Sequence, residues 1–169
     1  MRKLRGVLLF LIVGVALILQ ATVFDFIRIL GAKPDLIMLI VIFYGFIHGP
    51  REGAYLGFLA GLLMDFATGH YIGLNALSKM AVGYLAGMGE ERLYQENTFI
   101  AVFVAMAGTL VGQTINFLLL LMVGIKISVG SALLTVILPV TFYNGLLTPF
   151  LYGLFYRSNT RGLLKTPDL

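Results

Sequence analysis

Residues 53–87, GAYLGFLAGLLMDFATGHYIGLNALSKMAVGYLAG, combine regularly spaced glycines with two charged residues in a largely apolar stretch. The glycines of the first half recur every four residues, so on a helix they share one face: Gly53, Gly57 and Gly61. In water each glycine would weaken a helix by about 1 kcal/mol relative to alanine. In lipid the same spacing is typical of closely packed helices. Gly83 and Gly87 repeat it further on, so we predict a helical hairpin whose packing groove is lined by these five glycines.

Asp65 takes the next position of the glycine register, and Lys79 follows within the second apolar run. A charge at lipid depth needs a partner. The turn between the two helices centres near His70, so antiparallel packing would let the long Lys79 stem reach toward Asp65. We predict either an intramembrane ion pair of Asp65 with Lys79 or an aspartate that caps the turn. A proton or ion relay is the sharper alternative, but it lacks a second acid. The hairpin is expected to be the unit on which the rest of the chain packs.

The composition indicates that a bilayer is the solvent for most of this chain. Hydrophobic residues make up 59% of its 169 residues and charged residues 12%, about half the charge of a soluble domain. The absence of cysteine excludes disulfides, thiolate metal sites and cysteine nucleophiles. The net charge of +4 is spread over loop ends without an aromatic platform, so no nucleic-acid partner is predicted.

The apolar runs predict an all-α, polytopic membrane protein with a single integral membrane domain over residues 1–169 and six transmembrane helices. The expected helices cover about residues 6–24, 35–48, 53–68, 72–89, 99–124 and 131–156. The second and third are short for a hydrocarbon core of about 30 Å. We favour two short spans shielded by longer neighbours over a hairpin that enters part-way. Pro139 and Pro149 should kink or break the sixth helix, and residues 24–35 should form an interfacial stretch.

The basic residues predict that both termini are cytoplasmic, because basic residues are enriched in cytoplasmic loops. Eight fall on the side of the termini: Arg2, Lys3, Arg5, Arg51, Arg92, Arg157, Arg161 and Lys165. Three fall on the opposite side: Arg28, Lys33 and Lys126.

Polar side chains form stripes on the later helices. The fifth helix carries Thr109, Gln113 and Asn116 within one narrow sector, and the sixth carries Asn144 and Thr148. With Asn75, these residues form polar helix faces that are most simply interhelical hydrogen bonds in lipid. A polar ligand cavity is the alternative. His48 and His70 should lie at opposite ends of the bundle, so no metal site is predicted, and no catalytic or cofactor-binding motif occurs.

An ordered series of short motifs between residues 33 and 87 resembles the rod shape-determining protein MreD family. The motifs are Lys33-Pro34-Asp35, Gly49-Pro50, the series Gly53…Gly57…Gly61-Leu62-Leu63…Asp65, Gly73-Leu74-Asn75-Ala76-Leu77 and Gly83-Tyr84-Leu85…Gly87. The length, the basic N-terminus and the six-helix topology match over the whole chain.

The resemblance implies a non-enzymatic, multi-pass protein of the bacterial inner (cytoplasmic) membrane without cofactors, in the machinery that builds the side wall of rod-shaped cells. Its implied partners, besides membrane lipid, are MreC and, directly or through MreC, MreB, RodA and a class B penicillin-binding protein. The family is also similar in fold to the substrate-binding subunits of energy-coupling-factor transporters, so a vitamin-binding subunit is the alternative function. Such a subunit should present convergent polar residues on its outer side. That side is mostly apolar here, so a scaffold that holds MreC is favoured.

Overall fold

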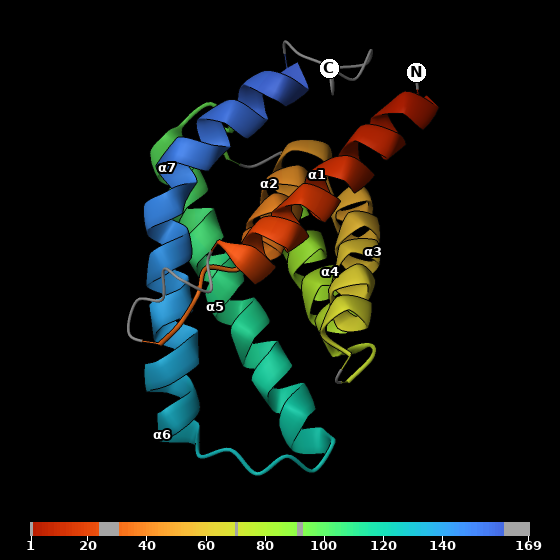
Figure 1. Cartoon of the computed structure of the whole chain (residues 1–169). Coiled ribbons are helices and arrows are strands. Elements are labelled where there is room, and N and C mark those ends of the chain that lie inside the picture. Colours follow the sequence, from red (N-terminus) through yellow and green to blue (C-terminus); the bar gives the residue numbers. More distant parts are fainter. Residues whose placement is uncertain (1, 24–30, 70, 91–92, 161–169) are drawn as a thin grey trace.

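The protein is a bundle of helices in which successive helices alternate in direction (Figure 1). The computed structural model describes residues 2–23, 31–69, 71–90 and 93–160, and all regular elements in this part of the chain are helices. They are α1 (Arg2–Thr22), α2 (Leu36–His48), α3 (Pro50–Thr68), α4 (Leu74–Gly87), α5 (Thr98–Met122), α6 (Val129–Ala132), the π-helical turn η1 (Leu133–Ile137) and α7 (Leu138–Thr160). The predicted all-α class is confirmed.

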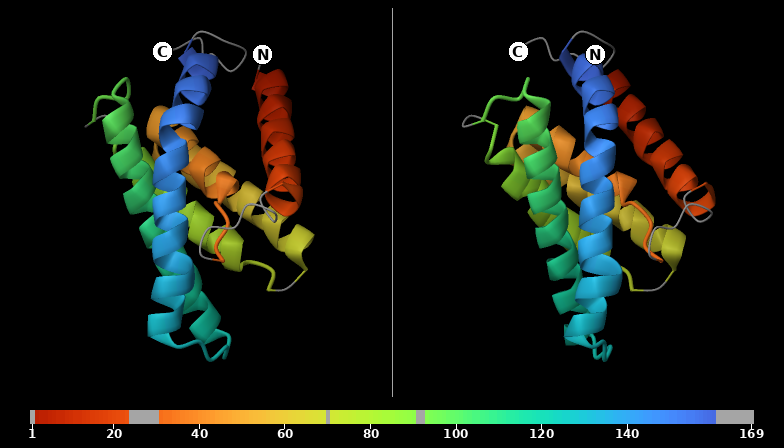
Figure 2. Two further views of the ribbon diagram at one scale, coloured as in Figure 1. Left: turned by 60° about the vertical axis from the view of Figure 1, so that its left-hand side comes forward. Right: turned by 90° about the vertical axis from the view of Figure 1, so that its left-hand side faces the viewer.

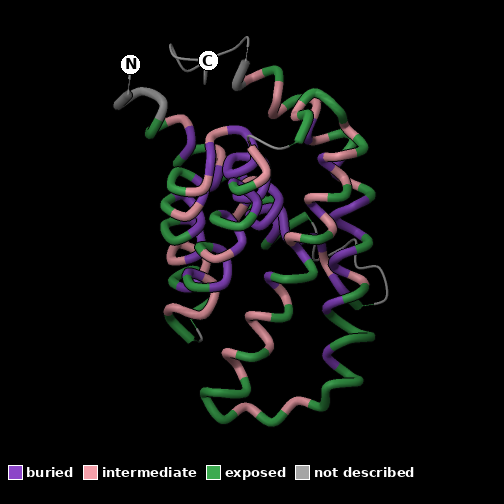
Figure 3. Tube along the Cα trace, turned by 180° about the vertical axis from the view of Figure 1, so that it is seen from behind, coloured by how far each residue is buried: buried purple, intermediate pink, exposed green. Residues whose placement is uncertain are grey.

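Helix α2 lies at the centre of the bundle and contacts α1, α3, α4, α5 and α7. Eleven of its 13 residues are buried, and the buried part of the trace is concentrated around it (Figure 3). A helix that is hydrophobic on every side belongs in a core, and the sequence of α2, LIMLIVIFYGFIH, has this character. The expectation that the chain packs on the α3–α4 hairpin therefore needs correction, because α2 occupies the centre and the hairpin packs against it.

The turns at both ends of α3 depend on glycine. Gly49 has φ +90° and Gly69 has φ +69°, backbone conformations that a residue with a Cβ rarely adopts. Pro50 then begins α3 at a position where its missing N–H is not needed. These residues set α2, α3 and α4 as three short antiparallel helices joined by tight turns.

Helices α5 and α7 are longer than the three short helices and extend beyond them at one end of the molecule (Figure 2). Thr98–Met122 and the continuous helical segment Val129–Ser158 are long and apolar enough to cross a membrane, judged by length and composition. The 25 residues of α5 correspond to about 37 Å, whereas the 13 residues of α2 correspond to about 20 Å. As predicted, the second helix is much shorter than its long neighbours, and α2 begins part-way along α5.

Of the two predicted outcomes at Pro139 and Pro149, a kink or a break, the structure shows no break, because the helix runs without interruption from Val129 to Thr160 and bends (Figure 1). The ring of a helical proline crowds the carbonyl four residues before it. For Pro139 that residue is Thr135, which lies in the wider turn η1. The N–H of Leu138 donates to the carbonyl of Leu133, a spacing of five residues that makes room for the ring.

Several predictions fall on residues outside the described part of the chain. They include the interfacial stretch over positions 24–30, His70, Arg92 and the basic residues after position 160.

Candidate functional site

The glycines of α3 bring its backbone into contact with the backbone of α4. A Cβ added to Gly57 would lie 2.7 Å from the carbonyl carbon of Lys79, and one added to Gly61 would lie 2.6 Å from the Cα of Ala76. Real Cβ atoms do not approach other atoms so closely, so neither position has room for a side chain. Gly53, Gly83 and Gly87 complete the crossing in the same way, each with backbone atoms of the facing helix against it.

Gly45 of α2 extends this crossing to a third helix, and the sequence reasoning missed it. A Cβ on Gly53 would lie 2.6 Å from the Cα of Gly45, and a Cβ on Gly45 would meet the carbonyl oxygen of Gly83. Three backbones therefore meet where α2, α3 and α4 cross. The signal was present in the sequence, because Gly45 and Gly49 continue the four-residue register of Gly53 backward.

Lys79 pairs with Asp35 at the start of α2, so the predicted ion pair between Asp65 and Lys79 is wrong. Lys79 Nζ lies 3.0 Å from Asp35 Oδ2, and it also donates to Asn75 Oδ1 at 3.0 Å. The two charged side chains are 1% and 8% exposed. Asn75 lies between Lys79 and Asp65, because its Oδ1 accepts from Lys79 and its Nδ2 donates to Asp65.

Asp65 instead caps the first turn of α4, which is the other outcome that the sequence left open. Its Oδ2 accepts from the N–H of Gly73 at 2.8 Å and of Ala76 at 3.1 Å. Its Oδ1 accepts from the N–H of Asn75 at 3.2 Å and from Asn75 Nδ2 at 2.9 Å. The first N–H groups of a helix lack partners within it and carry a partial positive charge, so a carboxylate is favoured there. These four bonds use the acceptor sites of the carboxylate.

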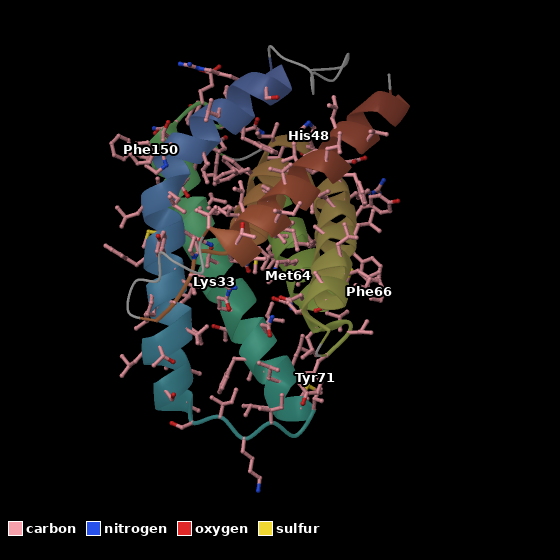
Figure 4. All side chains as sticks on the ribbon, in the orientation of Figure 1. Lys33, His48, Met64, Phe66, Tyr71 and Phe150 are labelled. Carbon is pink, nitrogen blue, oxygen red and sulfur yellow. The ribbon has the colours of Figure 1, made fainter. Side chains whose placement is uncertain are left out.

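Asp35 has a capping role at the start of α2 in addition to its pairing with Lys79. Its Oδ1 accepts from the N–H of Met38 at 2.9 Å. Its backbone N–H donates to Asn144 Oδ1 at 3.1 Å, and its carbonyl accepts from Asn144 Nδ2 at 3.4 Å. Figure 4 shows α2 running from the level of Lys33, in the middle of the molecule, to His48 at its other end. Both short helices that begin inside the bundle, α2 and α4, thus have an aspartate at their N-terminus.

The predicted polar residues of the later helices extend this cluster, with one exception. Asn144 Nδ2 donates to Thr109 Oγ1 at 3.1 Å, and Thr148 Oγ1 donates to the carbonyl of Asn144 at 2.7 Å. Asn116 Nδ2 donates to Asn75 Oδ1 at 3.2 Å. Gln113 is half-buried and makes no hydrogen bond to any described residue.

The connected side chains form one polar network of buried and half-buried residues that joins all the helices from α2 to α7 except the short α6 and η1. Its members are Asp65, Asn75, Lys79, Asp35, Asn144, Thr109 and Asn116. The sequence analysis did not include Asp35 as a member. A lysine within an apolar run requires a carboxylate partner, and Asp35 directly precedes the apolar helix α2. Within the described residues, no group of three or more His, Cys, Asp or Glu side chains is placed to hold a metal ion. The hydrogen bonds and the ion pair of this network hold the short helices against the long ones.

These features define a class: a small, all-helical, strongly apolar protein with charges buried between closely packed helices. The family model described as "rod shape-determining protein MreD" matches residues 1–158. The chain therefore belongs to the MreD family, which confirms the resemblance seen in the sequence. Membership gives it a role in determining rod shape and an association with the membrane. No curated protein and no solved structure matched the chain, so the likeness in fold to transporter subunits has no support from these comparisons.

Proposed function

We propose that this protein is a non-enzymatic scaffold of the bacterial cell-elongation complex that spans the inner membrane several times and holds MreC. The family match over residues 1–158 is the observation that carries the proposal. In this role the protein helps to position peptidoglycan synthesis along the side wall. MreB, RodA and the class B penicillin-binding protein associate with it directly or through MreC.

A six-span topology with cytoplasmic termini agrees with three features of the chain. Successive helices alternate in direction (Figure 1), and two of the helical segments are long and apolar enough to span a bilayer. Eight basic residues fall on the side of the termini and three on the other side. Of the short helices, α2 is covered in part by α1, α5 and α7, and α4 by α5, which reduces their contact with lipid.

The buried charges favour a scaffold over a relay. A relay residue needs acceptor sites that are open to an incoming donor, whereas a carboxylate that accepts four hydrogen bonds has its acceptor sites occupied. Asp65 is bound in this way, and Lys79 is tied to Asp35 and Asn75. Removal of either partner of such a pair is costly. We therefore assign these charges to the relative placement of the helices.

Co-purification tests the proposal. The tagged protein, expressed with MreC and extracted in mild detergent, should retain MreC through size-exclusion chromatography. An unrelated single-span membrane protein, expressed at the same level, serves as the control and should be lost. Retention of neither protein, or of both equally, would contradict the scaffold function.

Reporter fusions test the topology separately. A fusion at Gly31 should report the periplasm and a fusion after Leu169 the cytoplasm. If both fusions reported the same compartment, the result would contradict the six-span arrangement.

A further inference from the structure

Four threonines on the outer faces of the helices have hydroxyl groups that are hydrogen-bonded within their own helix. Thr22, Thr68, Thr114 and Thr135 each donate their hydroxyl to the carbonyl four residues earlier, at 2.7 to 2.9 Å. A hydroxyl bonded in this way tolerates a lipid environment because its donor is already paired. These four threonines therefore do not indicate a partner.

Gln113 of α5 differs from these threonines. Its amide has two donors and an acceptor, and it makes no hydrogen bond to a described residue although the side chain is half-buried. Asn116, one turn further along the same face, uses its Nδ2 on Asn75 Oδ1. An amide without a partner is costly to place in an apolar medium. A pair of amides at this position is therefore poorly suited to lipid alone.

The surroundings of this pair are open on the side of the α3–α4 turn. Asn116 lies opposite Asn75, in the first turn of α4, and beyond it α5 continues without α4 beside it (Figure 2). A Cβ on Gly69 or Gly73, in the α3–α4 turn, would meet nothing within 4 Å. Among the described residues, the end of α5 that extends past α4 has η1 and α7 as its neighbours (Figure 2).

The depth of the amides decides what can meet them. Gln113 lies nine residues before Met122, where α5 ends, which corresponds to about 13 Å along the helix. On the proposed topology this is inside the hydrocarbon core, beyond the reach of lipid headgroups. The groups that regularly bring hydrogen-bonding side chains to that depth are those of another membrane-spanning helix.

We propose that Gln113 and Asn116 form the contact point for the single membrane-spanning helix of a partner, which presents a hydroxyl, carboxamide or carboxyl side chain to them. The inference rests on the proposed function, in which the protein holds the single-span protein MreC, and it adds the surface. The spacing of three residues places both amides in one ridge, and apolar residues of α5 on either side, Leu110 and Leu120, extend the contact.

Substitution of Gln113 separates a contact role from a structural role. Because Gln113 makes no hydrogen bond within the described chain, Gln113→Leu should leave the thermal midpoint of the isolated protein unchanged or higher. Capture of MreC should fall about three- to tenfold, the range for an interhelical side-chain hydrogen bond. Thr114→Val, at the same depth, removes a hydroxyl that is already bonded to Leu110 and should leave capture unchanged. Unchanged capture with Gln113→Leu, or an equal loss with Thr114→Val, would overturn the proposal.

Crosslinking locates the surface directly, because the chain has no native cysteine. Cysteine in place of Gln113, labelled with a benzophenone maleimide in membranes that contain MreC, should give an adduct with MreC. Cysteine in place of Leu118, which is 52% exposed and lies about 140° around the same helix, should not.

The outcomes distinguish this inference from the proposed function. An adduct of MreC with position 118 only, an adduct between two copies of this chain, or modification of lipid only would overturn the contact surface while MreC still co-purifies. Failure of the unchanged protein to retain MreC would overturn the proposed function itself.

Discussion

Helices α2, α3 and α4 are held together by their backbones, whereas α5 and α7 are held together by side chains. Where these three helices cross, Gly45, Gly53 and Gly83 bring the three backbones into contact. Against α5, by contrast, a Cβ on Gly108 or Gly112 would meet side chains rather than backbone, namely those of Ile42, Met38 and Val82. Short helices with little surface of their own thus gain contact by close approach, and long helices gain it by length. The two regions should therefore differ in their tolerance of substitution.

The largest expected effect is a side chain in the crossing of α3 with α4. Gly57→Leu should lower the free energy of unfolding by about 4 kcal/mol or more, since the side chain must push the α4 backbone away. A thermal melt in detergent measures it. Gly153→Ala in α7 is the matched control, because its Cβ would meet nothing within 4 Å, and it should be neutral or slightly stabilising. Equal effects of the two would mean that the regions do not differ.

Loss of the buried cation should come next. Lys79→Met leaves Asp35 in low dielectric without its counter-ion, which costs about 3–5 kcal/mol. The exposed Lys126, in the loop after α5, provides the control, and Lys126→Met should change the unfolding midpoint little. A Lys79 variant as stable as the Lys126 variant would show that the pair contributes nothing to the centre of the bundle.

A smaller effect is expected at the cap of α4. Asp65→Ala removes the acceptor for three backbone N–H groups and should cost about 2 kcal/mol. The cap of α5 is the comparison: Asn97 accepts from Phe99 N–H at an exposed position, where water can replace the side chain. Asn97→Ala should therefore cost about 1 kcal/mol or less. If both substitutions were equally mild, the interior start of α4 would be open to water.

The smallest expected effect lies between the two regions. Ser78 Oγ donates to the carbonyl of Gly112 at 2.6 Å and joins α4 to α5 in a buried position. Ser78→Ala should cost about 1 kcal/mol, and Thr114→Val, on the outer face of α5, should stay within about 0.5 kcal/mol. Chemical unfolding of both variants measures the loss of unfolding free energy. A larger loss for Thr114→Val than for Ser78→Ala would contradict the assignment of inner and outer faces.

Periodicity predicted much of this fold because it reports on local geometry. The four-residue glycine register indicated the α3–α4 crossing, and the apolar runs gave all the long helices with small errors at their ends. The four-residue spacing of the glycines gives no information on the path of α2 through the centre of the bundle. Its uniform apolar sequence does carry that information, since only a surrounded helix can lack a polar side.

Pairing between distant residues was the part that sequence could not supply. Asp65 lies closer to Lys79 in sequence than Asp35 does, and the nearer acid was chosen. The actual choice depends on the tertiary arrangement: the backbone N–H groups of α4 already occupy Asp65, and α2 begins beside Lys79. Asn144 is bound to the backbone of Asp35, a contact over 109 residues for which a sequence pattern offers no signal.

A pair of double-mutant cycles tests most directly the central claim, that Lys79 locks α4 to the start of α2 through Asp35. The stabilities of Asp35→Asn, Lys79→Met and the double variant are measured in the same detergent, and the same set is made with Asp65→Asn. We expect a coupling energy of about 0.5–3 kcal/mol for Asp35 with Lys79 and a smaller one for Asp65 with Lys79, which are linked through Asn75. A larger coupling for Asp65, or strictly additive losses for Asp35, would contradict it.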